Sequence, residues 1–517
     1  MRKYIKIAIV TVMTGLLTGC NKNLDFVPED YFADGNYWQN ETQVNNFMVG
    51  IHNDLRNKQF MLFRLGEMRG GGLSNTARMD VSLNELSIIN HGMTEVSPGI
   101  GAWAGFMNSI LQINLFISKM ETISFVPSDK KAQLLGQAYG LRAYYYFHLL
   151  RTYGGVPLRL TPDVLLDKPD AVNLRMARSS EAEVLAAIKG DIAASVQNFG
   201  TIQGTNKAYW SLNATRMLKG EVFLWSAKVY NNTADLVEAK NALNAVAGYS
   251  LLTNFGDVFK QKRNSEIIFT LPFAFNEAEA SSVSLFLYPV ANFNGIYYKD
   301  TVNVNAPKLV DPLNIAQASA GGIQRYAYTY ELFQSYGIND QRRNSTFYDF
   351  YGIDRTVTPN KVTIRNTVLT KFMGTVNNNI RNWTDDWPIY READRLLMLA
   401  EIANAEGTDP KNYLQPIRDR AFNGIDPLPF VNGSKDANEL AIFAERAKEF
   451  VWEGKRWYDL RRMKLGGDPL AFKGTGNPYG VLNKSTDAYK LLWPVGRDVW
   501  TNDPLVEQTP GYTTTKP

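Results

Sequence analysis

Apolar residues recur at helical spacing along much of the chain, and the clearest run spans residues 436–466. Asp436 and Glu439 have the spacing of a capping box, and Gly466 can end the helix. The apolar positions between them are three or four residues apart, or at sums of these intervals: Leu440, Phe443, Ala447, Phe450, Val451 and Tyr458. Such spacing places one apolar stripe on one helical face. We therefore predict a single helix over 436–466.

The charged residues of this run have two interpretations. Its arginines could form a ligand-binding face, or they could brace the scaffold through ion pairs with nearby carboxylates. The second interpretation is favoured, because opposite charges stand three or four positions apart. The expected pairs are Lys455–Asp459, Glu453–Arg456 and Asp459–Arg462, and Arg456, Arg461 and Arg462 are expected to brace the scaffold through Glu449, Glu453 and Asp459.

Further segments have the same helical periodicity, and one of them opens with the capping box Ser180…Glu183. They form antiparallel-looking pairs joined by short turns, with Ala and Gly where helices would touch. Their period is compatible with tetratricopeptide-like repeats of about 34 residues, although no literal repeat is visible. We predict a mostly α, tetratricopeptide-like scaffold of helix pairs, with helices at 40–56, 103–117, 128–153, 180–199, 213–230, 234–247, 387–405 and 410–422.

Two stretches lack this periodicity. Residues 60–101 are rich in glycine and are expected to be loops, which are unusual at such length and often functional. Residues 251–386 are rich in Asn, aromatic residues and turns, with strand-like pieces at 266–270 and 361–364. We predict an irregular, loop-rich subdomain with short strands, inserted into the scaffold. The expected division is 1–19, 20–250, 251–386 and 387–517.

The N-terminus has the pattern of a leader segment. Arg2, Lys3 and Lys6 precede an apolar run over 7–17, which is too short to span a bilayer stably. The run closes on Leu-Thr-Gly before Cys20, the only cysteine of the chain. This resembles a bacterial lipobox, in which the cysteine becomes the lipid-modified first residue; the alternative is an ordinary secretory signal. We predict a body tethered to a membrane surface by lipid.

Composition narrows the choice of partner. The 517 residues are 45% hydrophobic and 12% aromatic, as in a globular protein with many flat side chains. Removing residues 1–19 takes away three positive charges and no acid, so the formal net charge falls from +4 to +1. This balance argues against binding to a nucleic-acid backbone.

Catalytic patterns are scarce in the sequence. The three histidines, His52, His91 and His148, have no zinc-site spacing, and we find neither a G-x-S-x-G elbow nor a Walker A lysine. Residues 99–104 match G-x-G-x-x-A, but no strand precedes them. A carboxylate pair for glycoside hydrolysis stays an alternative, because the 51 acidic residues offer many pairs. No cofactor is expected, with a structural Ca²⁺ left open.

A binding surface remains, and the residue types favour sugars. A sugar site needs an aromatic platform flanked by amide, Asp and Arg side chains, because sugars present C–H faces and a rim of hydroxyls. Two stretches, 69–80 and 288–298, have this mixture, and residues 382–383 form a third, weaker one. The predicted binding residues are Asn75, Arg78, Asp80, Tyr288, Asn292, Phe293, Tyr297, Tyr298 and Trp383.

In several motifs the chain resembles the SusD/RagB family. The run 436–466 is similar to the C-terminal signature of that family, and residues 388–401 are similar to its other strong motif. Two departures stand out: Thr509 replaces the usual Asn before the final Pro-Gly-Tyr, and Glu392 replaces a commoner aromatic residue. The signature residues are Glu445-Arg446, Glu449, Glu453-Gly454, Arg456-Trp457 and Asp459-Leu460-Arg461-Arg462, with further matches at 24–28, 137–157, 417–421 and 508–512.

The resemblance implies a surface-exposed outer-membrane lipoprotein. It would capture oligosaccharide without cleaving it and sit as a lid on a SusC-like TonB-dependent transporter. Its irregular subdomain would carry the glycan site, but the family motifs transfer no individual glycan contact. The competing hypotheses are a surface glycoside hydrolase, a peptide-capturing lid and a scaffold without ligand.

Overall fold

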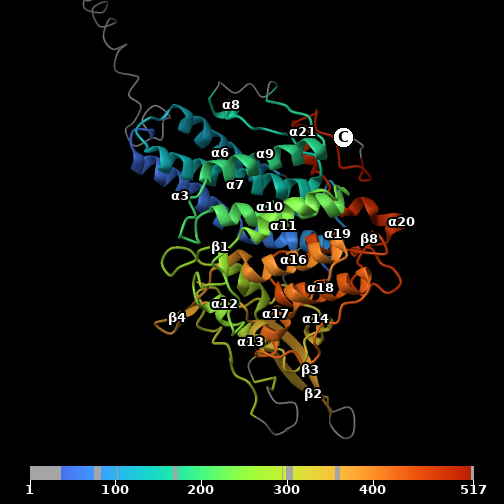
Figure 1. Cartoon of the computed structure of the whole chain (residues 1–517). Helices are drawn as coiled ribbons and strands as arrows, with labels where there is room; N and C mark the ends of the chain where they lie inside the picture. The colour runs from blue at the N-terminus through green and yellow to red at the C-terminus, as the bar shows by residue number, and fades with distance from the viewer. Residues whose placement is uncertain are drawn as a thin grey trace, which may run out of the picture.

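Antiparallel helices packed side by side form most of the molecule, and short strands and irregular segments form one end (Figure 1). The N-terminal helices are α3 (Glu41–Asn57), α4 (Gln59–Gly66), α6 (Ala104–Thr122), α7 (Ser128–Tyr153), α9 (Glu181–Phe199), α10 (Leu212–Val229) and α11 (Asp235–Asn244). The computed structural model describes residues 37–74, 83–101, 103–166, 172, 174–293, 295–298, 307–354 and 361–513.

These N-terminal helices pack in chain order, with α7 between α6 and α9, and α10 between α9 and α11. The predicted capping box of α9 is present, since Ser180 accepts from the Glu183 N–H and Glu183 accepts from the Ser180 N–H. Close packing requires Gly140 on α7, because a Cβ there would lie 2.0 Å from Nε1 of Trp210. The mostly α, tetratricopeptide-like fold predicted from periodicity is confirmed.

The C-terminal helices continue this scaffold, and α16 packs against α10 and α11. They are α16 (Glu392–Glu406), α17 (Lys411–Ala421), α18 (Lys435–Glu449) and α19 (Arg456–Arg462). The prediction of one helix over 387–405 is wrong at its start, where residues form strand β6 (Trp387–Arg391). This strand pairs antiparallel with β1 (Ile267–Leu271), and all its side chains are buried.

The prediction of one helix over 436–466 is also wrong, because α18 ends at Glu449 and α19 begins at Arg456. The start differs as well: Ser434 caps α18 by accepting from the Ala437 N–H. Between the two helices Gly454 has φ of 69° and lies directly against Gly66 of α4, where a Cβ would meet the Gly454 oxygen at 1.7 Å. A side chain at residue 66 would therefore collide with the backbone between α18 and α19.

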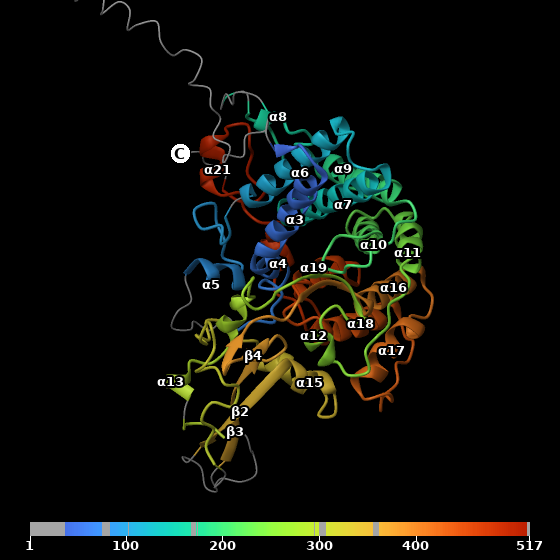
Figure 2. The same ribbon diagram turned by 90° about the vertical axis from the view of Figure 1, so that its left-hand side faces the viewer.

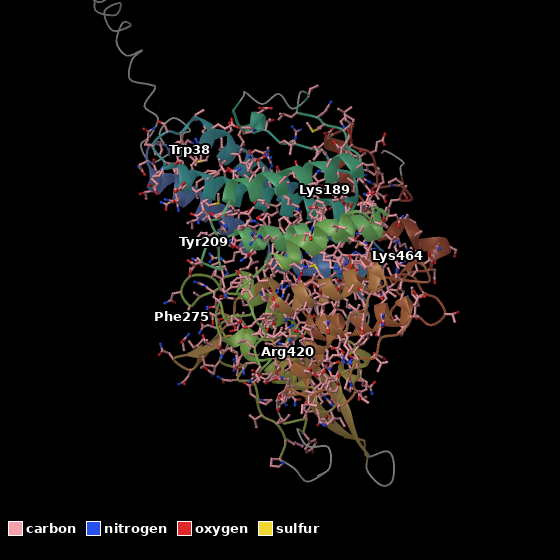
Figure 3. The ribbon with its side chains drawn as sticks, in the orientation of Figure 1. Trp38, Lys189, Tyr209, Phe275, Arg420 and Lys464 are labelled. Atoms are coloured by element: carbon pink, nitrogen blue, oxygen red, sulfur yellow. The ribbon has the colours of Figure 1, made fainter. Side chains whose placement is uncertain are left out.

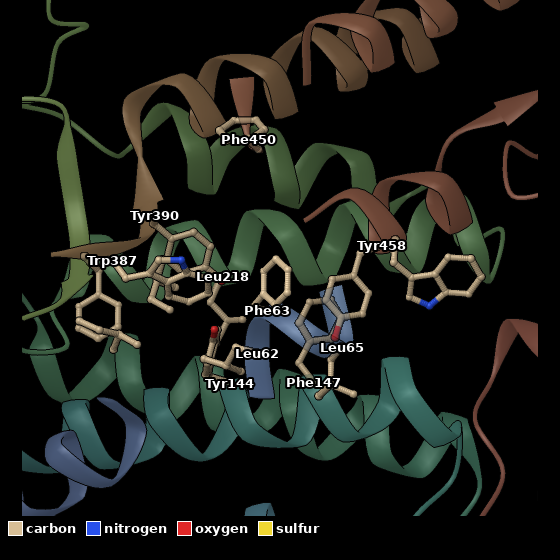
Figure 4. Close-up of a cluster of buried hydrophobic side chains, with 14 of the residues drawn as sticks. Leu62, Phe63, Leu65, Tyr144, Phe147, Leu218, Trp387, Tyr390, Phe450 and Tyr458 are labelled. Atoms are coloured by element: carbon tan, nitrogen blue, oxygen red, sulfur yellow. The ribbon is translucent and has the colours of Figure 1, made fainter. Parts of the chain in front are cut away.

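Helix α4 lies within the core, although residues 60–101 were predicted to be loops. Figure 4 shows its side chains Leu62, Phe63 and Leu65 between α7 and the strand that carries Trp387 and Tyr390. All five of these side chains are buried. The loop prediction is therefore wrong for α4, and also for α5 (Leu83–Ile89).

Short elements complete the fold. Strand β2 (Phe347–Asp354) pairs antiparallel with β3 (Lys361–Leu369), with Phe347 opposite Leu369. None of the helices among the described residues is both long and apolar enough to cross a membrane. The remaining elements are α8 (Asp163–Leu166), α12 (Asp257–Lys260), η1 (Ser281–Phe286), α13 (Val290–Phe293), α14 (Tyr330–Gln334), α15 (Gln341–Thr346), β4 (Thr375–Asn377), β5 (Ile380–Asn382), β7 (Lys464–Leu465), β8 (Asp468–Pro469), α20 (Lys484–Asp487), η2 (Ala488–Leu491) and α21 (Arg497–Asn502).

Several charged residues of α18 and α19 are buried in ion pairs, but most partners differ from those predicted. Arg462 does pair with Asp459, at 2.8 Å, and also binds Glu401 of α16 at 2.9 Å. Glu449 and Glu453 pair instead with Arg391, at 2.6 and 2.8 Å. The predicted pairs Lys455–Asp459 and Glu453–Arg456 are wrong: Lys455 binds Asp394, and Arg456 donates to the Gly70 oxygen. Arg461 likewise donates to a backbone oxygen, that of Arg151.

Candidate functional site

The structure links the stretch 69–80 to the residues just before the stretch 288–298. Residues 322–329 lie between residues 72–74 on one side and 284–288 on the other. Backbone hydrogen bonds join them: Ser74 N to Ala327 O and Thr329 N to Gly72 O, both 2.8 Å, and Tyr326 N to Leu285 O, 3.0 Å. The three segments lie near α5 and α13 at the left of Figure 2.

Buried side chains of the scaffold contact Arg69 and Gly70, at the start of the stretch 69–80. Arg456 donates from Nε to the Gly70 oxygen at 2.6 Å. The Arg69 guanidinium lies 4.2 Å from the ring of Trp457 and donates from Nε to Nδ1 of His91 at 3.3 Å. Burial, and then the charge of Arg69, lower the pKa of His91 to about 2. His91 is therefore neutral and can accept this bond.

Aromatic and charged side chains gather where these segments meet α4 and α5. The Tyr326 ring lies 5.3 Å from Phe286 and 6.5 Å from Phe60, between ring centroids. The Arg64 guanidinium lies 5.8 Å from the Phe60 ring and donates to the Gly99 oxygen at 2.8 Å. Nη1 of Arg325 lies 3.8 Å from a Glu85 oxygen, and the Arg325 side chain is 30% exposed. We call Phe60, Arg64, Glu85, Gln324, Arg325 and Tyr326 the α4–α5 cluster.

Several donors of this cluster have no partner. Nε of Arg64, Nε2 of Gln324 and Nε of Arg325 are shielded from solvent and bond to nothing in the described part of the chain. The three atoms themselves are covered, but Arg64, Gln324 and Arg325 are half-buried as whole residues, so other parts of them face solvent. Burial, and then Glu85, raise the pKa of Tyr326, so its hydroxyl stays protonated.

Four of the aromatic rings predicted to bind sugar lie in the core instead. Tyr288, Phe293, Tyr298 and Trp383 are all buried. The Tyr288 hydroxyl donates to Asp311 at 2.6 Å, and the Tyr288 ring stacks on Phe293 at a centroid distance of 4.0 Å. Other side chains cover these rings, so in this conformation a sugar cannot stack on them. We correct the interpretation of these four residues to packing.

The remaining predicted residues have different placements. Tyr297 is half-buried, with its ring centroid 4.7 Å from that of Phe350, and part of it faces solvent. Asn292 belongs to α13, but its side chain lies outside the described structure. Asn75, Arg78 and Asp80 also lie outside the described residues, in the gap between residue 74 and α5.

Sequence reasoning missed the α4–α5 cluster entirely. Phe60 and Arg64 stand four positions apart on one face of α4, a helical signal hidden by the glycines that follow. Gln324, Arg325 and Tyr326 carry an amide, a cation and an aromatic ring in succession. This is the mixture of residue types that a sugar site needs, but it lies in a segment without helical periodicity.

The described part of this site offers little for catalysis. Glu85 lies near Arg325 and Tyr326, whereas glycoside hydrolysis uses a pair of carboxylates. No group of three or more potential metal ligands was found in the part of the chain that the structure describes. The arrangement offers donors, a ring and a half-exposed cation, which suit binding.

Comparison with known proteins gives consistent matches over nearly the whole chain. The family model described as "SusD family" matches residues 294–512, and the one described as "Starch-binding associating with outer membrane" matches residues 25–202. SusD-like protein P38 of Formosa agariphila is 25% identical, over 99% of this chain and 100% of its own length.

Solved structures agree with these matches. A SusD superfamily protein from Bacteroides fragilis is 36% identical with a TM-score of 0.83, covering 92% of this chain and 100% of that one. NanU from B. fragilis is 32% identical with a TM-score of 0.79, covering 94% and 100%. A laminarin-binding SusD-like protein, at 18% identity and a TM-score of 0.65, shares the fold.

Proposed function

Because this chain belongs to the SusD/RagB family, we propose that it is a non-catalytic, carbohydrate-binding protein of the outer membrane. The observation that carries the proposal is the α4–α5 cluster, which combines a half-buried aromatic ring with half-buried guanidinium and amide side chains. One matching family model is described as starch-binding and outer-membrane-associated.

The cluster supplies the elements of sugar recognition. Phe60 is half-buried, and its exposed part offers an apolar face for the C–H side of a sugar ring. The half-buried side chains of Arg64, Gln324 and Arg325 carry N–H groups that can donate to hydroxyl oxygens. Tyr297, Asn75, Arg78 and Asp80 stay predicted sugar contacts from the sequence. Binding then requires no bond cleavage, and the ligand leaves chemically unchanged.

The rest of the proposal concerns delivery. The protein is anchored by lipid at Cys20, faces the cell exterior and passes oligosaccharide to a SusC-like TonB-dependent transporter. The lipobox-like leader and the family resemblance support this part. The helical body would then be the rigid support that presents the ligand to the transporter.

Titration calorimetry with a panel of neutral oligosaccharides tests the proposed site. We expect at least one to bind, and we expect Phe60→Ala to weaken binding by about 1–3 kcal/mol, borrowing the scale of base stacking on aromatic rings. Arg325→Ala should cost about 1.5–3 kcal/mol, because it removes charged donors. The matched control is Arg395→Ala, which removes an arginine paired with Glu392 on α16, and which should leave affinity unchanged.

Other outcomes identify the competing functions. Release of shorter sugars during incubation would make the protein a hydrolase. If no oligosaccharide binds and peptides do, the ligand class is wrong. Unchanged affinity in both Phe60→Ala and Arg325→Ala would move the site away from the α4–α5 cluster.

A further inference from the structure

A pocket lies on the helical scaffold, apart from the α4–α5 cluster. Its volume is about 600 Å³, within the range of about 300–1,000 Å³ that is usual for ligand sites. It is lined by the loop 203–207, by Asn213 and Arg216 of α10, and by Gly248 and Tyr249 after α11. Tyr209, labelled at the left edge of Figure 3, belongs to the same connection between α9 and α10.

The pocket contains two cations and no acid. Lys207 lies 5.1 Å from the centre of the Tyr249 ring and donates to the Asn264 oxygen at 2.6 Å. Arg216 donates from Nη1 to the Asn213 side chain and to the Ala245 oxygen, both at 3.0 Å. All these acceptors are neutral, and none of the described lining residues is Asp or Glu.

Two lysines on the neighbouring helices α9 and α10 do have carboxylate partners. Lys189 of α9 binds Asp235 at 2.6 Å, and Lys219 of α10 binds Glu238 at 2.6 Å. Lys207 and Arg216 form no such pair with any described residue. Burial lowers the pKa of both groups, because their charged forms are partly removed from water without an anion beside them in the described structure. A bound carboxylate would compensate these charges and would have no internal carboxylate to displace.

The geometry suits a carboxylate attached to a sugar. Both bonds of Arg216 leave from Nη1, and no other bond of this guanidinium is found within the described structure, so its Nε and Nη2 edge can take a carboxylate in two parallel bonds. Tyr249 is half-buried and adds an aromatic surface, and its hydroxyl accepts from the buried Asn213 amide at 3.3 Å. A free inorganic anion would use the cations but leave most of this volume unfilled.

We propose that this pocket binds the carboxylate of an acidic saccharide, with Arg216 as its main ligand and Lys207 as the second cation. The saccharide part rests on the carbohydrate-binding function proposed above, but the pocket is separate from the α4–α5 cluster. The protein would thus accept uronate-containing oligosaccharides at a position distinct from its neutral sugar contacts.

Calorimetry on the full mature protein tests this, with trisaccharides of galacturonate, glucuronate and mannuronate, each beside its neutral counterpart. At least one acidic trisaccharide should bind ten times more tightly than its counterpart. Arg216→Gln should abolish this preference and Lys207→Gln should reduce it several-fold. Arg216→Lys should keep part of it, because it retains the charge without the fork. Lys219→Gln, on the same helix, should leave it unchanged.

Several results would overturn the proposal. No preference for any acidic trisaccharide would do so, as would a preference that survives Arg216→Gln in a variant with an unchanged melting temperature. Inorganic sulfate binding as tightly as the best acidic trisaccharide would reduce the pocket to a general anion site. If neutral sugars bind and respond to Phe60→Ala while Arg216→Gln changes nothing, this inference fails and the proposed function stands.

Discussion

At the scale of single residues, close approach between segments decides which positions must be glycine. Gly140 faces Trp210, and no Cβ fits between them. Gly190 on α9 also sits within a helix, yet nothing lies within 4 Å of where its Cβ would be. The sequence suggests that helices touch at small residues, but the printed letters do not distinguish these two positions.

This difference predicts opposite effects of one substitution. Gly140→Ala should lower the free energy of unfolding by about 1–3 kcal/mol, because the added methyl overpacks the contact with Trp210. Gly190→Ala should raise it by about 0.5–1 kcal/mol, since alanine favours an exposed helix over glycine. Denaturant unfolding of both variants measures this, and equal effects would contradict the packing seen at Gly140.

At the scale of elements, local pattern predicts the helices but not their interruptions. The bounds of α7 agree with the prediction, because the signals lie in the helix and in the glycine that directly follows it. The break after Glu449 depends on α4, which is far away in sequence, and the strand β6 depends on β1. Such features need knowledge of a distant partner.

One link between elements should make stability depend on pH. Burial alone would raise the pKa of Glu401 on α16, but Arg462 and Lys228 outweigh burial and lower it to about 2. The Glu401 carboxylate binds a proton near pH 4.5 in the unfolded chain and near pH 2 in the folded chain. The stabilisation is therefore complete above about pH 4.5 and is lost as pH falls towards 2.

Glu401→Gln should cost about 3–5 kcal/mol at pH 7, because Arg462 stays buried with fewer partners. Its stability should also fall less than that of the wild type between pH 5 and about 2. Glu406→Gln is the control, since Glu406 pairs with Lys240 at the surface of the same helix. Unfolding curves at several pH values test both, and parallel curves for wild type and Glu401→Gln would contradict this link.

At the scale of the whole molecule, the sequence predicts the scaffold better than the site. The family signature residues, such as Glu449, Arg462 and Trp457, are buried in the helical body. The α4–α5 cluster instead draws Phe60, Glu85 and Arg325 from segments that periodicity does not relate. Aromatic residues were expected to mark the site, but an aromatic-rich stretch fills a core as readily as it lines a surface.

The lipid anchor proposed at Cys20 gives a prediction at this scale. Cys20→Ala, made with residues 1–19 replaced by an ordinary cleavable secretory signal, should release the protein from the membrane fraction. Acyl chains supply about 0.8 kcal/mol per buried CH₂, and the variant has none. Fractionation with labelled fatty acid measures both attachment and acylation. Firm attachment of the unlabelled variant would mean that a protein partner holds it.

The segment 322–329 has a consequence for how such proteins diversify. Its bonds to residues 72–74 and 284–288 run between backbone groups, which are the same whatever side chains the residues carry. Substitutions along these segments can therefore alter the side chains of the proposed site while the three segments keep their register. Related proteins can therefore differ in ligand preference while their helical scaffold stays the same.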